Sequence, residues 1–205
     1  MKFIQFKEKL QKLSLFSLAD IHILDPGFHR NQLTGWLRQG YIKKLKKGFY
    51  FFSDTVMDES FLYIVANKIY SPSYVSLEFS LAHYGFIPES VYAITSISTR
   101  KTKTIVTDIG TFLYRNIKTD LMFGYHLEKT SALTYKTASP EKAVLDFLYF
   151  NKTLGDLSSI QEMRFNVVEM QSKIDWEKCD RYLVAFNSPT LNNRFQQLKA
   201  YIFHA

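Results

Sequence analysis

The order of the elements predicted for the first 53 residues constrains the fold more than any other feature of this chain. Apolar residues recur at helical spacing over residues 3–13, and Ser17 with Asp20 has the spacing of a capping box that opens a second, short helix. A third helix is expected over about residues 28–39, followed by Gly40, a residue type that commonly ends helices. Three helices followed by a hairpin are typical of a winged helix-turn-helix domain.

The predicted hairpin follows the third helix directly. Two β-prone runs, Tyr41-Ile42 and residues 49–52, are joined through a lysine-rich segment that ends at Gly48. We therefore expect residues 1–55 to form a winged-helix DNA-binding domain. In such a domain the second and third helices form the helix-turn-helix, and the third lies in the major groove of DNA.

The third predicted helix separates an apolar face from a polar one. At about 100° per residue, one face holds Leu33, Trp36 and Leu37, with His29 nearby. The outward side presents side chains that suit base edges and phosphates, namely Arg30, Asn31, Gln32, Thr34 and Arg38. A polar helix face on its own is more often a solvated surface, so this feature is informative only together with the basic hairpin that follows.

The net charge of +7 is concentrated in the same segment. Up to Ser53 there are ten basic and three acidic residues, whereas the rest of the chain has sixteen of each. A basic block joined to a neutral one indicates a polyanion-binding module attached to a part with another role. We expect Asn31, Thr34 and Arg38 to lie near base edges, with Gln32 at the side. The cations expected to neutralise phosphates are Arg30, Lys43, Lys44, Lys46 and Lys47.

The pattern changes after residue 55. Two helices are expected first, near residues 58–69 and 77–85, and β-prone segments then follow at 91–98, 104–107, 111–117, 122–127 and 134–137. Ser139, Pro140 and Glu141 have the order of a cap, a first helical proline and a first-turn acid, which opens a strong helix. Further helices are expected near 156–164, 175–186 and 189–203. We therefore predict an α+β chain in which residues 56–205 form a mixed α/β domain with a mostly antiparallel sheet and a helical C-terminus.

Motifs for catalysis or cofactor binding are missing from the sequence. It has no GxSxG, no phosphate-binding glycine loop and no Gly-Ser turn followed by the paired aspartates of nucleotidyl transfer. The histidines and the single cysteine, Cys179, lack metal-ligand spacing. Glu78 and His83 are five residues apart and do not share a helix face, and Asp146 is expected to be a cap partner, an ion-pair member or an exposed residue. We predict no enzymatic activity, no cofactor and no metal.

Targeting signals are also not visible. The sequence shows no signal peptide and no run of about 18 uncharged apolar residues, the length that a membrane-spanning helix requires. The single cysteine excludes an intramolecular disulfide. We expect a cytoplasmic protein without membrane partners.

Three segments resemble a known family. Residues 28–52, FHRNQLTGWLRQGYIKKLKKGFYFF, are similar to the winged-helix start of the AbiEi-type antitoxins of type IV toxin–antitoxin (abortive infection) systems. Residues 74–102, YVSLEFSLAHYGFIPESVYAITSISTRKT, and 137–150, TASPEKAVLDFLYF, resemble the second domain of that family, which is linked to antitoxin activity. The resemblance implies a bacterial repressor that binds repeated double-stranded sites in its own promoter. It also implies a nucleotidyltransferase-like toxin as functional partner, countered without a stable complex.

Two alternatives remain open at this stage. In one, the second domain is an enzyme or a ligand-sensing module and DNA binding serves location only; a version of it is a stand-alone transcriptional regulator, without a toxin, whose C-terminal domain senses a ligand or partner. In the other, the chain is mainly a protein-interaction partner that titrates a toxin. A nucleotide or metal bound to the second domain would favour the first, and co-purification with the neighbouring gene product would favour the second.

Overall fold

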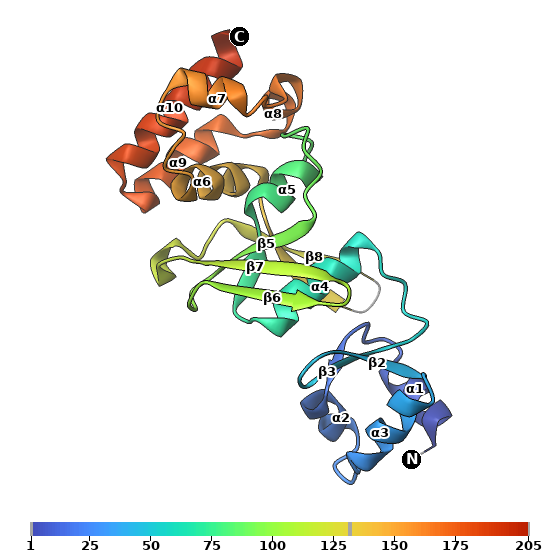
Figure 1. Ribbon diagram of the computed structural model, residues 1–205. Helices are drawn as coiled ribbons and strands as arrows, with labels where there is room; N and C mark the ends of the chain where they lie inside the picture. The colour runs from blue at the N-terminus through green and yellow to red at the C-terminus, as the bar shows by residue number, and fades with distance from the viewer. Residues whose placement is uncertain (1, 131–132, 205) are drawn as a thin grey trace.

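The computed structural model describes residues 2–130 and 133–204, and it has an α+β fold with helices, a mixed sheet and a helical C-terminal part. Figure 1 shows three tiers: α1–α3 with a small sheet, a larger sheet with α4, and the helices α5–α10. Met1, Ser131, Ala132 and Ala205, which the two predicted domains include, lie outside the described residues. The boundary predicted at residue 55 stays a prediction.

The first tier contains three helices and a small antiparallel sheet. Its elements are α1 (Phe3–Leu10), β1 (Phe16–Ser17), α2 (Leu18–Leu24), α3 (Asn31–Arg38), β2 (Ile42–Lys46) and β3 (Phe49–Phe52), with strand order β1-β3-β2. The capping box of α2 forms as predicted, because the Ser17 Oγ accepts from the Asp20 N–H at 3.2 Å and the Asp20 carboxylate accepts from the Ser17 N–H at 2.7 Å. The strand β1 was not predicted, since two residues are too few to show an alternating pattern.

Two predicted helices of this tier are longer than those observed. The first helix ends at Leu10 rather than at residue 13, because the Leu13 N–H turns back to the Leu10 carbonyl at 2.7 Å. The third helix begins at Asn31 rather than at residue 28, so His29 precedes it and is exposed. His29 is therefore not part of the helix whose apolar face it was expected to lie near.

Both faces of the β2–β3 hairpin are buried. Ile42 and Phe52 belong to the core formed with α1–α3. Leu45 and Phe51 belong to a second core formed with α4 and the larger sheet, where the ring centroids of Phe51 and Phe61 are 5.6 Å apart. This double burial explains the unbroken aromatic sequence of β3, because a strand covered on both faces has no solvent side for polar residues. The hairpin therefore joins the first tier to the second.

The second tier is a six-stranded sheet of order β6-β7-β5-β4-β9-β8. Its strands are β4 (Ser73–Val75), β5 (Ala93–Ser98), β6 (Lys103–Thr107), β7 (Gly110–Asn116), β8 (Tyr125–Thr130) and β9 (Leu133–Ala138). Three neighbouring pairs are antiparallel, while β4–β9 and β5–β7 are parallel. The sheet is thus mixed, with most pairs antiparallel as predicted, and its two parallel pairs arise because the unpredicted strand β4 enters its centre and β6 pairs outside β7.

The remaining elements are helical. They are α4 (Glu59–Ile69), α5 (Leu77–His83), the short 3-10 helix η1 (Thr119–Leu121), α6 (Pro140–Phe150), α7 (Leu157–Glu162), α8 (Val167–Lys173), α9 (Trp176–Phe186) and α10 (Pro189–His204). Ser139 caps α6 as predicted, accepting from the Lys142 N–H at 3.3 Å. The helix α8 was not predicted, and Met170 is its one buried residue, too little for a visible apolar pattern.

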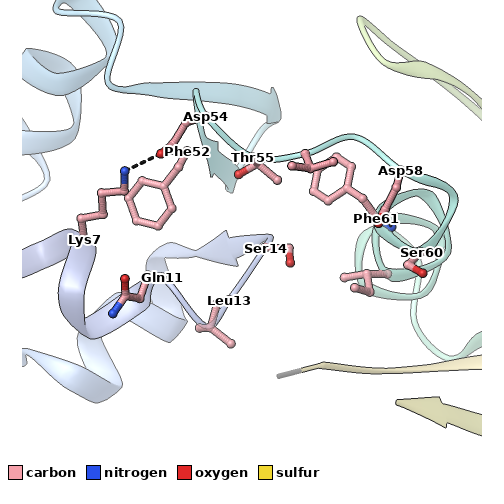
Figure 2. Close-up of a pocket in the computed structure, with 12 residues that line it drawn as sticks. Lys7, Gln11, Leu13, Ser14, Phe52, Asp54, Thr55, Asp58, Ser60 and Phe61 are labelled. Atoms are coloured by element: carbon pink, nitrogen blue, oxygen red, sulfur yellow. Dashed lines mark hydrogen bonds and ion pairs between the residues drawn. The ribbon is translucent and has the colours of Figure 1, made fainter. Parts of the chain in front are cut away.

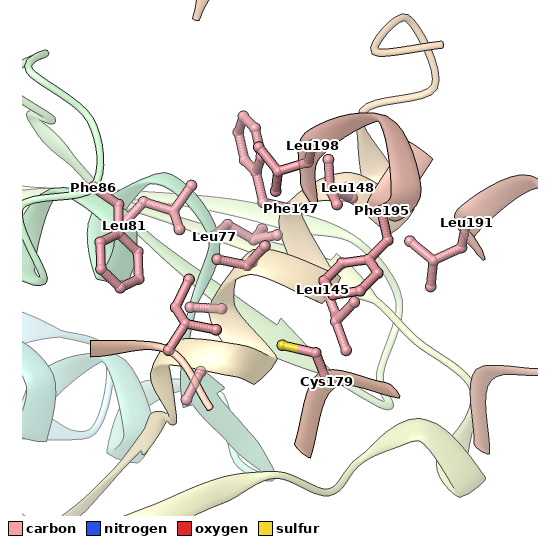
Figure 3. Packing of buried hydrophobic residues seen from close by; sticks show 14 of the residues in the cluster. Leu77, Leu81, Phe86, Leu145, Phe147, Leu148, Cys179, Leu191, Phe195 and Leu198 are labelled. Carbon is pink, nitrogen blue, oxygen red and sulfur yellow. The ribbon is translucent and has the colours of Figure 1, made fainter. Parts of the chain in front are cut away.

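The helices of the third tier enclose a hydrophobic core around α6. Figure 3 shows Leu145 and Leu148 of α6 among side chains of α5, α9 and α10. Cys179 of α9 lies completely buried in this core, and burial raises the pKa of its thiol above its ordinary value. The cysteine is therefore a packing residue.

Candidate functional site

The helix α3 ends in a rigid connection to the hairpin. Gly40 adopts a left-handed conformation with φ of 72°, and its N–H bonds to the Leu37 carbonyl while the Tyr41 N–H bonds to the Trp36 carbonyl, at 3.1 and 3.0 Å. These two bonds form a Schellman motif, which needs a residue that tolerates positive φ. The Ser53 N–H then bonds to the Tyr41 carbonyl at 3.1 Å. The end of the hairpin is thereby fixed to the end of α3.

The two faces of α3 differ as predicted. Leu33 and Trp36 are buried in the first core, with 2% and 7% of their surface exposed, and Leu37 packs beside them. On the opposite side the predicted base-contacting residues are exposed, and these are Asn31, Thr34 and Arg38. Gln32 is partly buried, and Arg30 is exposed at the N-cap position, where its side chain makes no capping bond.

The hairpin divides the predicted phosphate-contacting lysines between its two faces. In the strand register Lys44 lies opposite Tyr50, on the face toward α1–α3. Lys43 lies opposite Phe51 and Lys46 opposite Phe49, on the face toward the larger sheet. Lys43 and Lys44 are exposed along the edge strand, Lys47 is exposed in the turn, and Lys46 is partly buried. The structure thus does not gather these lysines into one row.

The predicted cations have no carboxylate beside them in the described chain, in contrast to some of its other lysines. Lys7, Lys68 and Lys178, for example, each pair with an aspartate or glutamate. Across residues 2–130 and 133–204, no carboxylate oxygen lies within 4.0 Å of the side-chain nitrogens of Arg30, Arg38, Lys43, Lys44, Lys46 or Lys47. Their charge is therefore available to an external anion.

Lys46 has cationic neighbours that the sequence-based set does not contain. Burial, and then the positive charges of Lys103 and Arg100, lower the pKa of the Lys46 ammonium. Arg100 and Lys103 belong to the β5–β6 loop and the start of β6, both on the larger sheet. The run Arg100-Lys101-Thr102-Lys103 is visible in the sequence, but it belongs to a part of the chain with no net charge and was not singled out.

A second polar cluster lies inside the third tier. Two segments that resemble the same family meet here, because the Tyr74 hydroxyl and the Ser76 hydroxyl each donate to the Asp146 carboxylate at 2.8 Å. The Lys142 ammonium pairs with the other carboxylate oxygen, and the side chains of Lys142 and Asp146 are fully buried. Of the three roles expected for Asp146, the structure shows the ion-pair member. Removing either member of a pair closed off from solvent would leave an uncompensated charge in the core.

The other polar groups considered in the sequence make ordinary surface contacts. The His83 Nδ1 lies 2.9 Å from Glu59, a carboxylate on α4, instead of pairing with Glu78. Within the described ranges, no group of three or more His, Cys, Asp or Glu side chains is arranged to hold a metal ion.

Among the helices that the structure describes, none combines the length and apolarity needed to cross a membrane.

A cavity of about 420 Å³ lies where the first tier meets α4, as Figure 2 shows. At one end the Lys7 ammonium and the Asp54 carboxylate are 2.5 Å apart, and this bond lowers the pKa of Asp54. At the other end Asp58 caps α4 by accepting from the Phe61 N–H at 2.8 Å. The polar groups of this cavity are therefore already engaged in contacts that stabilise the connection between the two tiers.

Comparison with known proteins leaves the family open. No protein-family model matches the chain, and no curated protein matches it. The resemblance of residues 28–52, 74–102 and 137–150 to the AbiEi-type antitoxins is therefore still an expectation. The arrangement of exposed, unpaired cations around α3 and the hairpin is the best-defined candidate site in the described chain.

Proposed function

We propose that this chain is a cytoplasmic DNA-binding transcriptional repressor whose first 55 residues form a winged helix-turn-helix. In this proposal α3 enters the major groove, and Asn31, Thr34 and Arg38 contact base edges, with Gln32 at the side. The cations of the helix start and the hairpin contact phosphates, and these are Arg30, Lys43, Lys44, Lys46 and Lys47. The protein acts by binding, not by catalysis.

One observation supports this proposal above all others. The outward face of α3 is polar and exposed, while its inward face is buried, and the neighbouring basic hairpin has no carboxylates paired to it in the described chain. An ordinary solvated surface mixes charges of both signs. A helix with donors and acceptors next to an uncompensated basic hairpin matches the two needs of DNA recognition, base reading and phosphate neutralisation.

The test is binding to the DNA upstream of the chain's own reading frame at fixed salt concentration. Arg38→Ala should weaken binding to that DNA by ~1–3 kcal/mol and reduce the preference over a scrambled duplex. Lys44→Ala should weaken binding to both duplexes equally, because a phosphate contact contains no sequence information. Wild-type protein that binds the two duplexes with equal affinity would refute sequence-specific recognition.

We further propose that the chain is the antitoxin of a type IV toxin–antitoxin system and represses its own operon through repeated sites. This part rests on the resemblance of residues 74–102 and 137–150 to the AbiEi-type second domain. Its partner would be a nucleotidyltransferase-like toxin encoded next to it, with no stable complex required. Co-expression with the adjacent gene tests the idea, since growth should be rescued by the intact chain and not by residues 1–55.

A further inference from the structure

We propose that the β5–β6 loop forms a second phosphate-contacting surface for the same DNA duplex, continuous with the β2–β3 hairpin. The contacting side chains are those of Arg100, Lys101 and Lys103. This inference rests on the proposed function, because it adds a contact to the complex that α3 and the hairpin form. It assigns a DNA-binding role to the part of the chain that has no net charge.

The chain after Ser53 has no net charge overall, but its basic and acidic residues are unevenly distributed. Residues 90–107 contain three basic residues, Arg100, Lys101 and Lys103, and no acidic one. All three side chains are exposed. Within residues 2–130 and 133–204, no carboxylate lies within 4.0 Å of their nitrogens. The loop is thus a locally uncompensated basic surface.

The loop and the hairpin lie on the same buried core, because Tyr70, whose ring centre is 4.2 Å from the Arg100 guanidinium and 5.7 Å from the Lys103 ammonium, belongs to it together with Leu45 and Phe51. Lys46 shares the strand face of Phe49, the face that packs toward the larger sheet. The charges of Lys103 and Arg100 reach Lys46 and lower its pKa, after the effect of burial. Like charges placed together without a carboxylate between them are unfavourable for the folded chain alone, and a phosphate backbone across them removes that repulsion.

The loop is also held in a fixed shape. The Arg100 guanidinium lies 4.2 Å from the centre of the Tyr70 ring and donates to the Ser71 carbonyl at 3.2 Å. The Tyr70 hydroxyl donates to the Lys101 carbonyl at 2.7 Å, and the Asn116 amide donates to the Arg100 carbonyl at 2.9 Å. Because the backbone is already ordered, binding an anion here loses little conformational entropy.

The burial of the hairpin explains why the two surfaces act on one duplex. Leu45 and Phe51 pack the hairpin onto α4 and the larger sheet, so the hairpin and the loop are held together by a hydrophobic core. A duplex that contacts Lys46 and Lys47 at the turn therefore passes close to the loop. The competing interpretation is a solvated basic loop that never meets DNA.

The experiment compares two double variants that remove equal charge. Lys101→Ala/Lys103→Ala removes two exposed cations from the loop, and Lys129→Ala/Lys152→Ala removes two exposed, unpaired cations elsewhere in the described chain. Affinity for the upstream duplex is measured over a range of salt concentrations, after circular dichroism confirms that both variants are folded.

We expect the loop variant to lower the slope of log affinity against log salt by about 2, since each phosphate contact contributes ~0.9. Its affinity near physiological salt should fall about tenfold on the upstream and the scrambled duplex alike, so sequence preference is unchanged. The control variant should keep the wild-type slope. Shortening the duplex at the end that contacts the loop should weaken binding of the wild type. The same shortening should not weaken binding of the loop variant further, because that variant has already lost this contact.

The outcomes separate the two proposals. If the loop variant keeps the wild-type slope and affinity while Arg38→Ala weakens binding, the second surface does not exist and the winged-helix proposal stands. If the control variant loses as much as the loop variant, net charge explains the effect and the inference is overturned. If the wild type does not bind DNA at all, the proposed function and this inference fall together.

Discussion

The Lys142 ammonium contacts the Asp146 carboxylate one turn further along α6, and neither side chain is exposed to solvent. Burial lowers the pKa of Lys142 and raises that of Asp146, while each charge opposes the shift of the other. Tyr74 and Ser76 donate to the remaining carboxylate oxygen. The pair therefore joins α6 to the β4 region through one fully buried network.

Removing one member of this pair should be far worse than removing both charges. We expect Lys142→Met and Asp146→Asn each to lower the free energy of unfolding by about 3–5 kcal/mol, because a buried charge is left without its partner. In the double variant the free energy of unfolding should fall by no more than half of the sum of the two single-variant decreases, since asparagine still accepts from Tyr74. Urea unfolding of the full chain measures this cycle, and strictly additive losses would contradict it.

A second prediction concerns stability in acid. Burial opposes ionisation of Glu141, but hydrogen bonds from Lys178, Ser139 and the Asp175 N–H prevail and lower its pKa. A carboxyl group with a lowered pKa in the folded state stabilises the protein above its ordinary pKa, and this contribution is lost as the pH falls through the folded-state pKa. Glu141→Gln should therefore be less stable than the wild type at pH 7, and the difference should shrink toward pH 3. Urea midpoints of both proteins across that pH range measure the difference in stability. A difference that stays constant with pH would contradict a lowered pKa of Glu141 in the folded state.

The double burial of the hairpin predicts that neighbouring phenylalanines have different effects. Phe51→Ala should cost about 3–5 kcal/mol and loosen the contact between the first two tiers, because Phe51 packs on Phe61 of α4. Phe52→Ala should cost a similar amount within the first tier, since Phe52 belongs to the other core. Hydrogen exchange should therefore increase in both β3 and α4 for Phe51→Ala, but not in α4 for Phe52→Ala. Equal exchange in α4 for both variants would argue against the assignment of faces.

Two glycines near α3 should respond in opposite directions to the same substitution. Gly40→Ala should destabilise by about 1–2 kcal/mol, because position 40 has a φ of 72° although there is space for a Cβ. Gly35→Ala should stabilise by roughly 1 kcal/mol, since a helix-interior alanine is favoured and nothing lies within 4 Å of the added atom. Thermal unfolding compares the two. A Gly35→Ala protein that is more stable but binds DNA more weakly would place DNA against this exposed helix face.

Local features of this protein were predictable from residues close together in the chain. The capping box at Ser17 and the cap at Ser139 are short-range hydrogen bonds, and a side chain can make them whatever surrounds the helix. The apolar and polar sides of α3 follow from helical periodicity, so the exposure of Asn31, Thr34 and Arg38 was predictable as well. Each of these depends on residues within about two helical turns of each other.

Other features were decided only by the tertiary structure. The strand β4 is three residues long and is defined by its neighbours in the sheet, which come from distant parts of the chain. The division of Lys43, Lys44 and Lys46 between two faces depends on a second core that covers the far side of the hairpin. The approach of Arg100 and Lys103 to Lys46 joins residues more than fifty positions apart. Sequence by itself determined where this protein is basic and which side of α3 is polar. Only packing of the hairpin onto the larger sheet decided which other cations lie beside it, because long-range hydrophobic contacts and not local propensity place segments that are distant in the chain.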